Sequence, residues 1–181
     1  EATSFYLPSA SLTIEGGDGT DSVTIGTGIV QAGMTLAIDA ESIAVSAGVV
    51  INLGSGDVSL HASATASGTI GDLLGIDTGL DFVDDALDLK FGISEASIDL
   101  TGATLIANNV TLNAESTLDL DSTGVSVSSL TVALVYAESL AEVILGGTQI
   151  AASGFLDIDA TSTVTANATI TADSGSSDSS L

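Results

Sequence analysis

Glycine and aspartate are concentrated in one short segment near the start of the chain, and these residue types suit a hard cation. The segment Gly16–Thr24 reads Gly-Gly-Asp-Gly-Thr-Asp-Ser-Val-Thr. Its glycines permit a turn that exposes backbone carbonyls, and its aspartates add carboxylate oxygens, which together form the ligand set that Ca²⁺ prefers. The order of residues fits the calcium-binding nonapeptide G-G-x-G-x-D-x-U-x at every specified position. The sequence therefore predicts a Ca²⁺ site formed by Gly17, Asp18, Gly19 and Asp21.

This motif is present in one complete copy. In repeats of this kind a calcium ion lies between successive turns, and the later stretch Leu53-Gly-Ser-Gly-Asp57 is only a fragment of a second copy. A plain Gly/Asp turn that opens the strand Val23–Ile25 is therefore the alternative to a bound ion.

Aspartates also occupy the outward positions of several predicted strands. If such strands stack in parallel, equivalent residues lie about 4.7 to 4.9 Å apart and two carboxylates at that spacing repel by roughly 0.9 kcal/mol even in water. Stacked carboxylates should therefore recruit divalent ions or take staggered positions; the alternative is scattered, solvated charges that maintain solubility. The residues concerned are Asp39, Asp99, Asp119, Asp121, Asp157 and Asp159.

Catalytic chemistry has little support in the residue set. Asp157 and Asp159 would lie about 6.6 Å apart on one strand face, within the range for an inverting glycosidase pair. However, the chain has no Trp, two Tyr and four Phe, so it is poor in the aromatic platforms of sugar-cleaving clefts. His61 is the sole histidine, and it has neither cysteine nor a G-x-S-x-G segment to complete a zinc site or a triad. We expect no enzyme, with a polysaccharide-active β-helix enzyme as an alternative.

The charge balance excludes several kinds of partner. Lys90 is the one basic side chain among 181 residues, set against 24 acidic ones, for a net charge of −23. Such a chain repels nucleic acid and anionic lipid surfaces and attracts divalent cations. Its apolar fraction of 45% predicts a folded core, and no apolar run reaches the length of a membrane span. With no cysteine, stability must come from packing and backbone hydrogen bonds.

Apolar and polar residues alternate in short bursts along almost the whole chain, which predicts β-strands. Breaks such as Glu41-Ser42 and Gly54–Asp57 reset the phase and are expected to be corners. Similar phrases recur, and three bursts with their corners take about the length of one coil of a parallel β-solenoid. The phrases are Leu36-Ala-Ile-Asp-Ala40, Val58-Ser-Leu-His-Ala62, Val110-Thr-Leu-Asn-Ala114 and Leu156-Asp-Ile-Asp-Ala160.

We therefore predict an all-β, right-handed parallel β-solenoid (β-helix) over residues 1–172, with an antiparallel β-sandwich as the alternative. Residues 68–96 break the rhythm and predict a partly helical excursion or capping insertion, or else a partner-binding groove, with re-entry into the sheet at about Leu87. Residues 173–181 predict a flexible acidic Ser/Gly tail or linker. The start at Glu1, without a methionine, suggests a processed product or a segment of a longer protein.

The phrase from Leu12 to Ile25, the strand phrases and the acidic Ser/Thr/Ala tail resemble repeat modules of large secreted bacterial surface proteins. These include calcium-dependent adhesins with RTX-type nonapeptides and haemagglutinin-like β-helix proteins. The resemblance implies an extracellular, cell-surface structural module of a fibre, filament or adhesin.

That module is expected to polymerise with itself or contact neighbouring modules of the same protein. Surface glycans are a further possible partner, and nucleic acid and membrane insertion are excluded. A pilin-like sandwich that donates residues 1–10 or its tail as a strand is the alternative. Asn109 and Asn167 fit the N-glycosylation sequon.

Overall fold

The computed structural model describes residues 6–66, 87–126 and 132–172 of the chain. Within these ranges the regular secondary structure is β-strand, and helix is absent. The all-β prediction is therefore confirmed for the described residues. The predicted helical part of the excursion, up to residue 86, and the predicted tail at 173–181 lie outside them. Among the described residues no helix has the length and apolar character needed to cross a membrane.

Thirteen strands form the described structure, and their lengths follow the alternating bursts of the sequence. In chain order they are β1 (Ser11–Glu15), β2 (Ser22–Ile25), β3 (Ile29–Val30), β4 (Thr35–Ala40), β5 (Ser42–Val45), β6 (Val50–Asn52), β7 (Val58–Ala66), β8 (Leu87–Asp99), β9 (Thr104–Ala107), β10 (Val110–Ser126), β11 (Val132–Ile144), β12 (Gln149–Ala152) and β13 (Leu156–Ala172).

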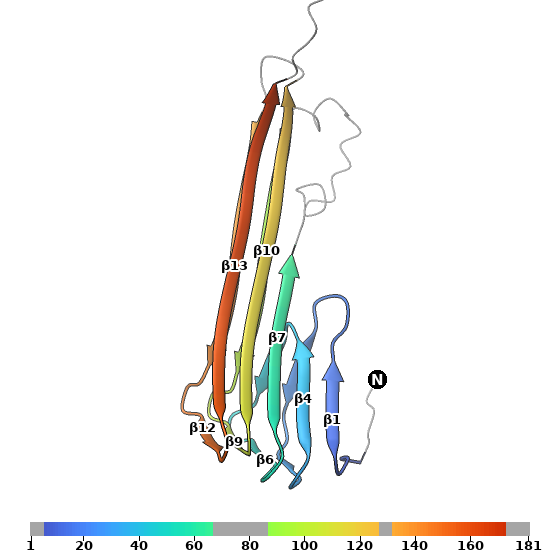
Figure 1. The fold of residues 1–181 in the computed structure, drawn as a ribbon, viewed down its shortest axis with the longest axis vertical. Helices are drawn as coiled ribbons and strands as arrows, with labels where there is room; N and C mark the ends of the chain where they lie inside the picture. The colour runs from blue at the N-terminus through green and yellow to red at the C-terminus, as the bar shows by residue number, and fades with distance from the viewer. Residues whose placement is uncertain (1–5, 67–86, 127–131, 173–181) are drawn as a thin grey trace, which may run out of the picture. The chain divides into compact units, whose positions relative to one another are not determined.

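These strands form three sheets, and every third strand along the chain belongs to the same sheet. Sheet A has the order β1-β4-β7-β10-β13, sheet B the order β11-β8-β5-β2 and sheet C the order β12-β9-β6-β3. Figure 1 shows the five strands of sheet A side by side in this order. Each sheet is therefore assembled from every third strand, although the first residues of successive strands in sheet A are 24 and then 23 residues apart at the start of the chain and 52 and then 46 apart later.

The strand pairs are parallel, and their register places the recurring phrases beside one another. Leu36, Ile38 and Ala40 of β4 are the partners of Val58, Leu60 and Ala62 of β7. The pairs β1–β4, β2–β5, β5–β8, β3–β6, β6–β9 and β9–β12 are parallel as well. The sandwich alternative requires antiparallel neighbours, so it is wrong for these pairs.

One apolar core runs beneath the strands of all three sheets. The inward residues of β4, β5, β6, β7, β9 and the first part of β10 are nearly all buried, and many are fully so. The period of two in the sequence directs alternate side chains to this core and leaves the intervening polar ones outside. Leu36, Ile43, Ile51, Leu60 and Leu105 are each completely buried.

The corners lie where the phase of the sequence resets. Glu41 alone separates β4 from β5, because Ser42 of the predicted corner is already the first residue of β5, and the predicted corner Gly54–Asp57 lies in the segment Leu53–Asp57 between β6 and β7. Gly56 is buried in this second corner, and a Cβ at its position would collide with the backbone carbonyl of Met34. The corner therefore requires glycine, because only a residue without a side chain can approach the neighbouring backbone so closely.

The chain divides into two compact units. The first comprises residues up to Thr65 together with Glu95–Ser116 and Leu140–Ser162, and the second includes the described residues of Ala66–Ser94, Thr117–Ser139 and Thr163–Leu181. Strands β8, β10, β11 and β13 contribute residues to both units.

The predicted re-entry into a sheet at Leu87 is confirmed by the start of β8. However, where the burial of β8 is described, the apolar residues of the alternating segment Leu87–Ile93 are not the ones that face the core. Ile93 is 66% exposed, whereas Gly92 and Ser94 are buried.

Candidate functional site

The acidic turn predicted to bind calcium is the loop from Gly16 to Asp21, between β1 and β2. Gly17 and Gly19 have φ angles of 93° and 121°, in the region that favours glycine. A Cβ at Gly16 would lie 2.8 Å from the Asp21 Cβ, so the loop closes tightly on that aspartate. The glycines of the motif therefore serve the turn geometry that the sequence predicts.

Asp21 is held at the end of this loop by the following corner. Its backbone N–H donates a hydrogen bond of 2.7 Å to Glu41 Oε2. Its own Oδ2 is buried and has no hydrogen-bond partner among the described residues. Buried polar atoms are nearly always satisfied by a protein group, a water or an ion, so this oxygen is the feature of the loop that most favours a bound donor or cation.

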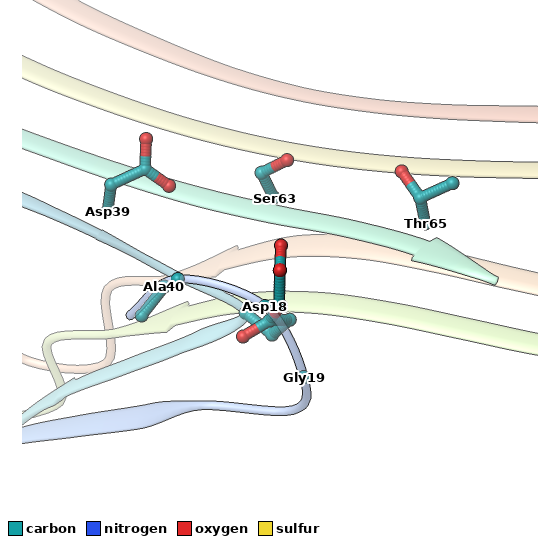
Figure 2. Close-up of a pocket in the computed structure, with 8 residues that line it drawn as sticks. Asp18, Gly19, Asp39, Ala40, Ser63 and Thr65 are labelled. Atoms are coloured by element: carbon teal, nitrogen blue, oxygen red, sulfur yellow. The ribbon is translucent and has the colours of Figure 1, made fainter. Parts of the chain in front are cut away.

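A pocket of about 350 Å³ lies beside the same loop, within the first unit. Asp18 and Gly19 border it from the loop, while Asp39, Ser63 and Thr65 border it from β4 and β7, as Figure 2 shows. The side chains of Asp39, Ser63 and Thr65 project from the outward phase of sheet A. The complete lining is Gly17, Asp18, Gly19, Asp39, Ala40, Glu41, Ser63 and Thr65.

The chemistry of this pocket is that of oxygen acceptors. Asp18, Asp39 and Glu41 supply carboxylates, Ser63 and Thr65 supply hydroxyls, and no lysine or arginine borders it. This set attracts cations and repels anionic ligands. Asp39 Oδ2 lies 3.1 Å from His61 Nδ1 on the neighbouring strand, so a protonated histidine would form an ion pair there.

The structure brings three of the four predicted calcium ligands together. Gly17, Asp18 and Gly19 line the pocket, whereas Asp21 is not among its lining residues. In the described part of the chain no group of three His, Asp or Glu side chains is placed to hold a metal ion. Calcium binding by this loop therefore stays a prediction.

Sequence reasoning missed that the pocket also draws on two strands of sheet A, β4 and β7. Glu41 was identified only as a corner residue, and Ser63 and Thr65 were not singled out. The signal was the strand register: Glu15 pairs with Asp39, and Asp39 pairs with His61. Continuing the same outward row along β7 leads to Ser63 and Thr65.

Two of the predicted outward aspartates, Asp39 and Asp121, do not stand in a continuous acidic row. Asp39 has one acidic neighbour, Glu15, and one histidine neighbour. Asp121 Oδ1 accepts a hydrogen bond of 2.8 Å from Asn167 Nδ2, so one sequon asparagine is engaged with a carboxylate. This arrangement limits the like-charge contacts that a stacked ladder would create.

The Asp157 and Asp159 pair lies on β13, an edge strand of sheet A, and both residues are exposed. Thr161 Oγ1 donates a hydrogen bond of 2.9 Å to Asp159 Oδ2. Neither aspartate borders the pocket described above. The second sequon residue, Asn109, accepts a hydrogen bond of 3.2 Å from the Phe155 N–H through its Oδ1.

Among the residues that the structure describes, two ionisable groups outside this pocket have perturbed pKa values. Hydrogen bonds from the side chain and the backbone N–H of Thr101 lower the pKa of Asp99, and the backbone bond measures 2.8 Å. The pKa of Tyr136 is raised by its hydrogen bond to Glu138 and by the charge of that carboxylate. Both perturbations follow from local contacts on strands and corners.

No protein-family model matches the chain, and comparison with curated proteins and with solved structures found no match.

Proposed function

We propose that this chain is a non-catalytic, extracellular structural module of a surface fibre, filament or adhesin, wound as a right-handed parallel β-solenoid. The single observation that carries the proposal is the return of every third strand to the same sheet, in parallel. Because each turn adds one strand to each sheet, such a fold is extended by adding turns, as in other repeat proteins.

The continuous core supports the winding. Residues that are partners across sheet A, such as Leu36 and Val58, are buried against the inward residues of sheets B and C in one cluster. A single turn of three strands buries too little apolar surface to be stable alone, whereas stacked turns bury a shared apolar core. A crystal or cryo-electron microscopy structure tests the winding and its hand directly.

The alternatives receive less support. A strand-exchanging pilin-like sandwich depends on antiparallel sheets, which differ from the parallel pairs described above. A polysaccharide-active enzyme would have to use carboxylates such as Asp157 and Asp159, which are exposed on an edge strand. The abundance of acidic and hydroxyl side chains on the outward faces is consistent with a solvated surface protein.

The location is tested on intact cells that produce the protein. We expect antibodies against the folded chain to label the outside of unpermeabilised cells, and added protease to remove the signal. Labelling only after permeabilisation would overturn the extracellular proposal. Antibodies against an abundant cytoplasmic protein provide the control for cell integrity.

We further propose that the loop Gly16–Asp21 binds Ca²⁺, because Asp21 Oδ2 is buried without a partner among the described residues and the adjoining pocket is lined by carboxylates. Calcium should raise the melting temperature of the wild-type protein, since a ligand that binds only the folded state stabilises it. The Asp18→Asn and Asp21→Asn variants should lose most of this increase.

The matched control is Asp119→Asn, which removes one charge from an exposed position of β10. If all four proteins respond equally to Ca²⁺, the ion acts by general screening, and the site proposal fails. Magnesium at the same concentration separates a specific Ca²⁺ effect from the effect of divalent charge.

A further inference from the structure

The two edge strands of sheet A carry the same pattern of inward apolar residues. Leu12 of β1 is the partner of Leu36 in β4, which is the partner of Val58 in β7. The Leu36 N–H donates to the carbonyl of Asp57, the residue just before its partner Val58. In the same way the Val58 N–H donates to the Asn109 carbonyl, and the Val110 N–H donates to the Phe155 carbonyl. This offset continues the column to Val110 of β10 and Leu156 of β13. A second column, two residues further along each strand, is Ile14, Ile38, Leu60, Leu112 and Ile158.

Both columns are buried in the middle of the sheet and open at its two ends. In β4, β7 and β10 these six side chains are at most 2% exposed. At the β13 end, Leu156 is 47% and Ile158 is 42% exposed. At the β1 end, Leu12 and Ile14 are only partly buried. Each end therefore has the apolar surface that one more matching strand would cover.

The outer edge of β1 also presents backbone N–H and C=O groups that could bond to a further strand. Toward β4, the Ala10 carbonyl accepts from the Thr35 N–H, and the Gly16 N–H donates to the Asp39 carbonyl. Because successive residues of a parallel strand direct their backbone groups to opposite sides, Thr13 directs its N–H and C=O away from β4. No described strand lies on this side of β1, and an open strand edge pairs readily with another strand.

We propose that β1 of a second copy of this chain pairs in parallel with β13, and so joins copies end to end through sheet A. This inference rests on the proposed structural role and identifies the contact surface for it. Pairing Leu12 with Leu156 and Ile14 with Ile158 continues both apolar columns without interruption. A contact between two different edges of the same chain can repeat indefinitely and produces a filament rather than a closed dimer.

The outward residues at this contact make its strength dependent on charge. The same register places Thr13 beside Asp157 and Glu15 beside Asp159. The second pair consists of two carboxylates at a strand spacing of about 4.8 Å, where like charges weaken association. End-to-end pairing should therefore increase as salt screens this repulsion.

Charge substitutions test the pairing, with association measured by sedimentation velocity over a range of protein and salt concentrations. Asp159→Lys converts the repulsive pair into an attractive one and should raise the association constant about tenfold at low salt. The double variant Glu15→Lys/Asp159→Lys restores a like-charge pair and should return association to about the wild-type level. The control Asp119→Lys makes the same change in net charge away from both edges.

Thr13→Pro provides a second, opposite test, because it removes the edge N–H while leaving the bonds to β4 in place. Circular dichroism and a thermal melt establish that this variant is folded. The association of Thr13→Pro should fall below that of the wild type at every salt concentration. If Thr13→Pro does not fold, the Asp159→Lys series still tests the pairing.

The outcomes separate this inference from the broader proposal. If the wild type assembles but Asp159→Lys matches Asp119→Lys and a folded Thr13→Pro assembles normally, the edge pairing is wrong while the structural role stands. If no protein in the series associates at any salt concentration, the pairing is likewise wrong, whereas the extracellular location is tested separately by cell-surface labelling.

Discussion

At the scale of single residues, the contacts of Asp99 make a pH-dependent contribution to stability. Hydrogen bonds from Thr101 lower its folded-state pKa below the unfolded value of about 3.9. The unfolded state therefore binds the proton more readily, and the stabilisation is present above that unfolded value and is lost as the pH falls through the folded pKa. Because the carboxylate is still partly exposed and screened by solvent, the contribution is a few tenths of a kcal/mol.

The Asp99→Asn variant tests this sign. At neutral pH it should unfold at slightly lower urea concentration than the wild type, and the difference should vanish in acid. Asp119→Asn provides the comparison for the loss of one exposed charge. A difference that grows as the pH falls would contradict the assignment.

The position of a residue in an apolar column decides what its truncation costs. Leu112 is completely buried, whereas Leu156 is 47% exposed. Leu112→Ala should destabilise the protein by about 2 to 5 kcal/mol, as for other core leucines. Leu156→Ala should cost about 1 kcal/mol when measured by urea denaturation in dilute, low-salt solution, because it removes much less buried surface. Equal costs would mean that the β13 edge is covered in the isolated chain.

The sequence identified the turn residues of the candidate site but not their surroundings. Gly17, Asp18 and Gly19 follow from one contiguous motif, which local reading detects. Ser63 and Thr65 join the pocket from β7, far along the chain, and only the register between strands places them there. The recurring phrases Leu36–Ala40 and Val58–Ala62 do align in this register, but both end before Ser63 and Thr65, so the sequence comparison did not reach these residues.

At the scale of elements, the corner before β7 depends on one glycine. A Cβ at Gly56 would collide with the Met34 carbonyl, and a backbone atom cannot move aside as a flexible side chain can. Gly56→Ala should therefore destabilise the protein by about 3 kcal/mol. Gly26→Ala is the matched control, because a Cβ there meets nothing within 4 Å. Similar denaturation midpoints for the two variants would contradict this account of the corner.

Alternation predicts that a segment is a strand more reliably than it predicts which face is buried. For β4 and β7 the apolar phase is the core phase. In β8 the prediction of a strand from Leu87 is correct, yet Ile93 is exposed and Phe91 stacks on Tyr136 of β11, with ring centroids 5.4 Å apart. Gly92 and Ser94 take the inward positions instead. At Gly92 a larger side chain would meet Leu118 and Leu120, so close packing decides the phase.

At the scale of the whole molecule, the net charge of −23 opposes the compact state. Self-repulsion among carboxylates is weakened by salt, whereas core packing is little affected by moderate salt. Raising NaCl from about 10 mM to about 0.3 M should therefore increase the melting temperature by a few degrees. Thr13→Pro should respond in the same way, which separates this effect from assembly. A melting temperature independent of salt would mean that the charges are too widely spaced to matter.

The described strands are not divided equally among the three sheets, since sheet A has five and sheets B and C have four each. Filaments joined through β13 and β1 would advance by the five strand spacings of sheet A, an axial period of about 24 Å. Sheets B and C would then lack one strand at every junction. Oriented fibres should therefore diffract at this long period as well as at the strand spacing, and the junctions should exchange their amide hydrogens before the rest of the fibre.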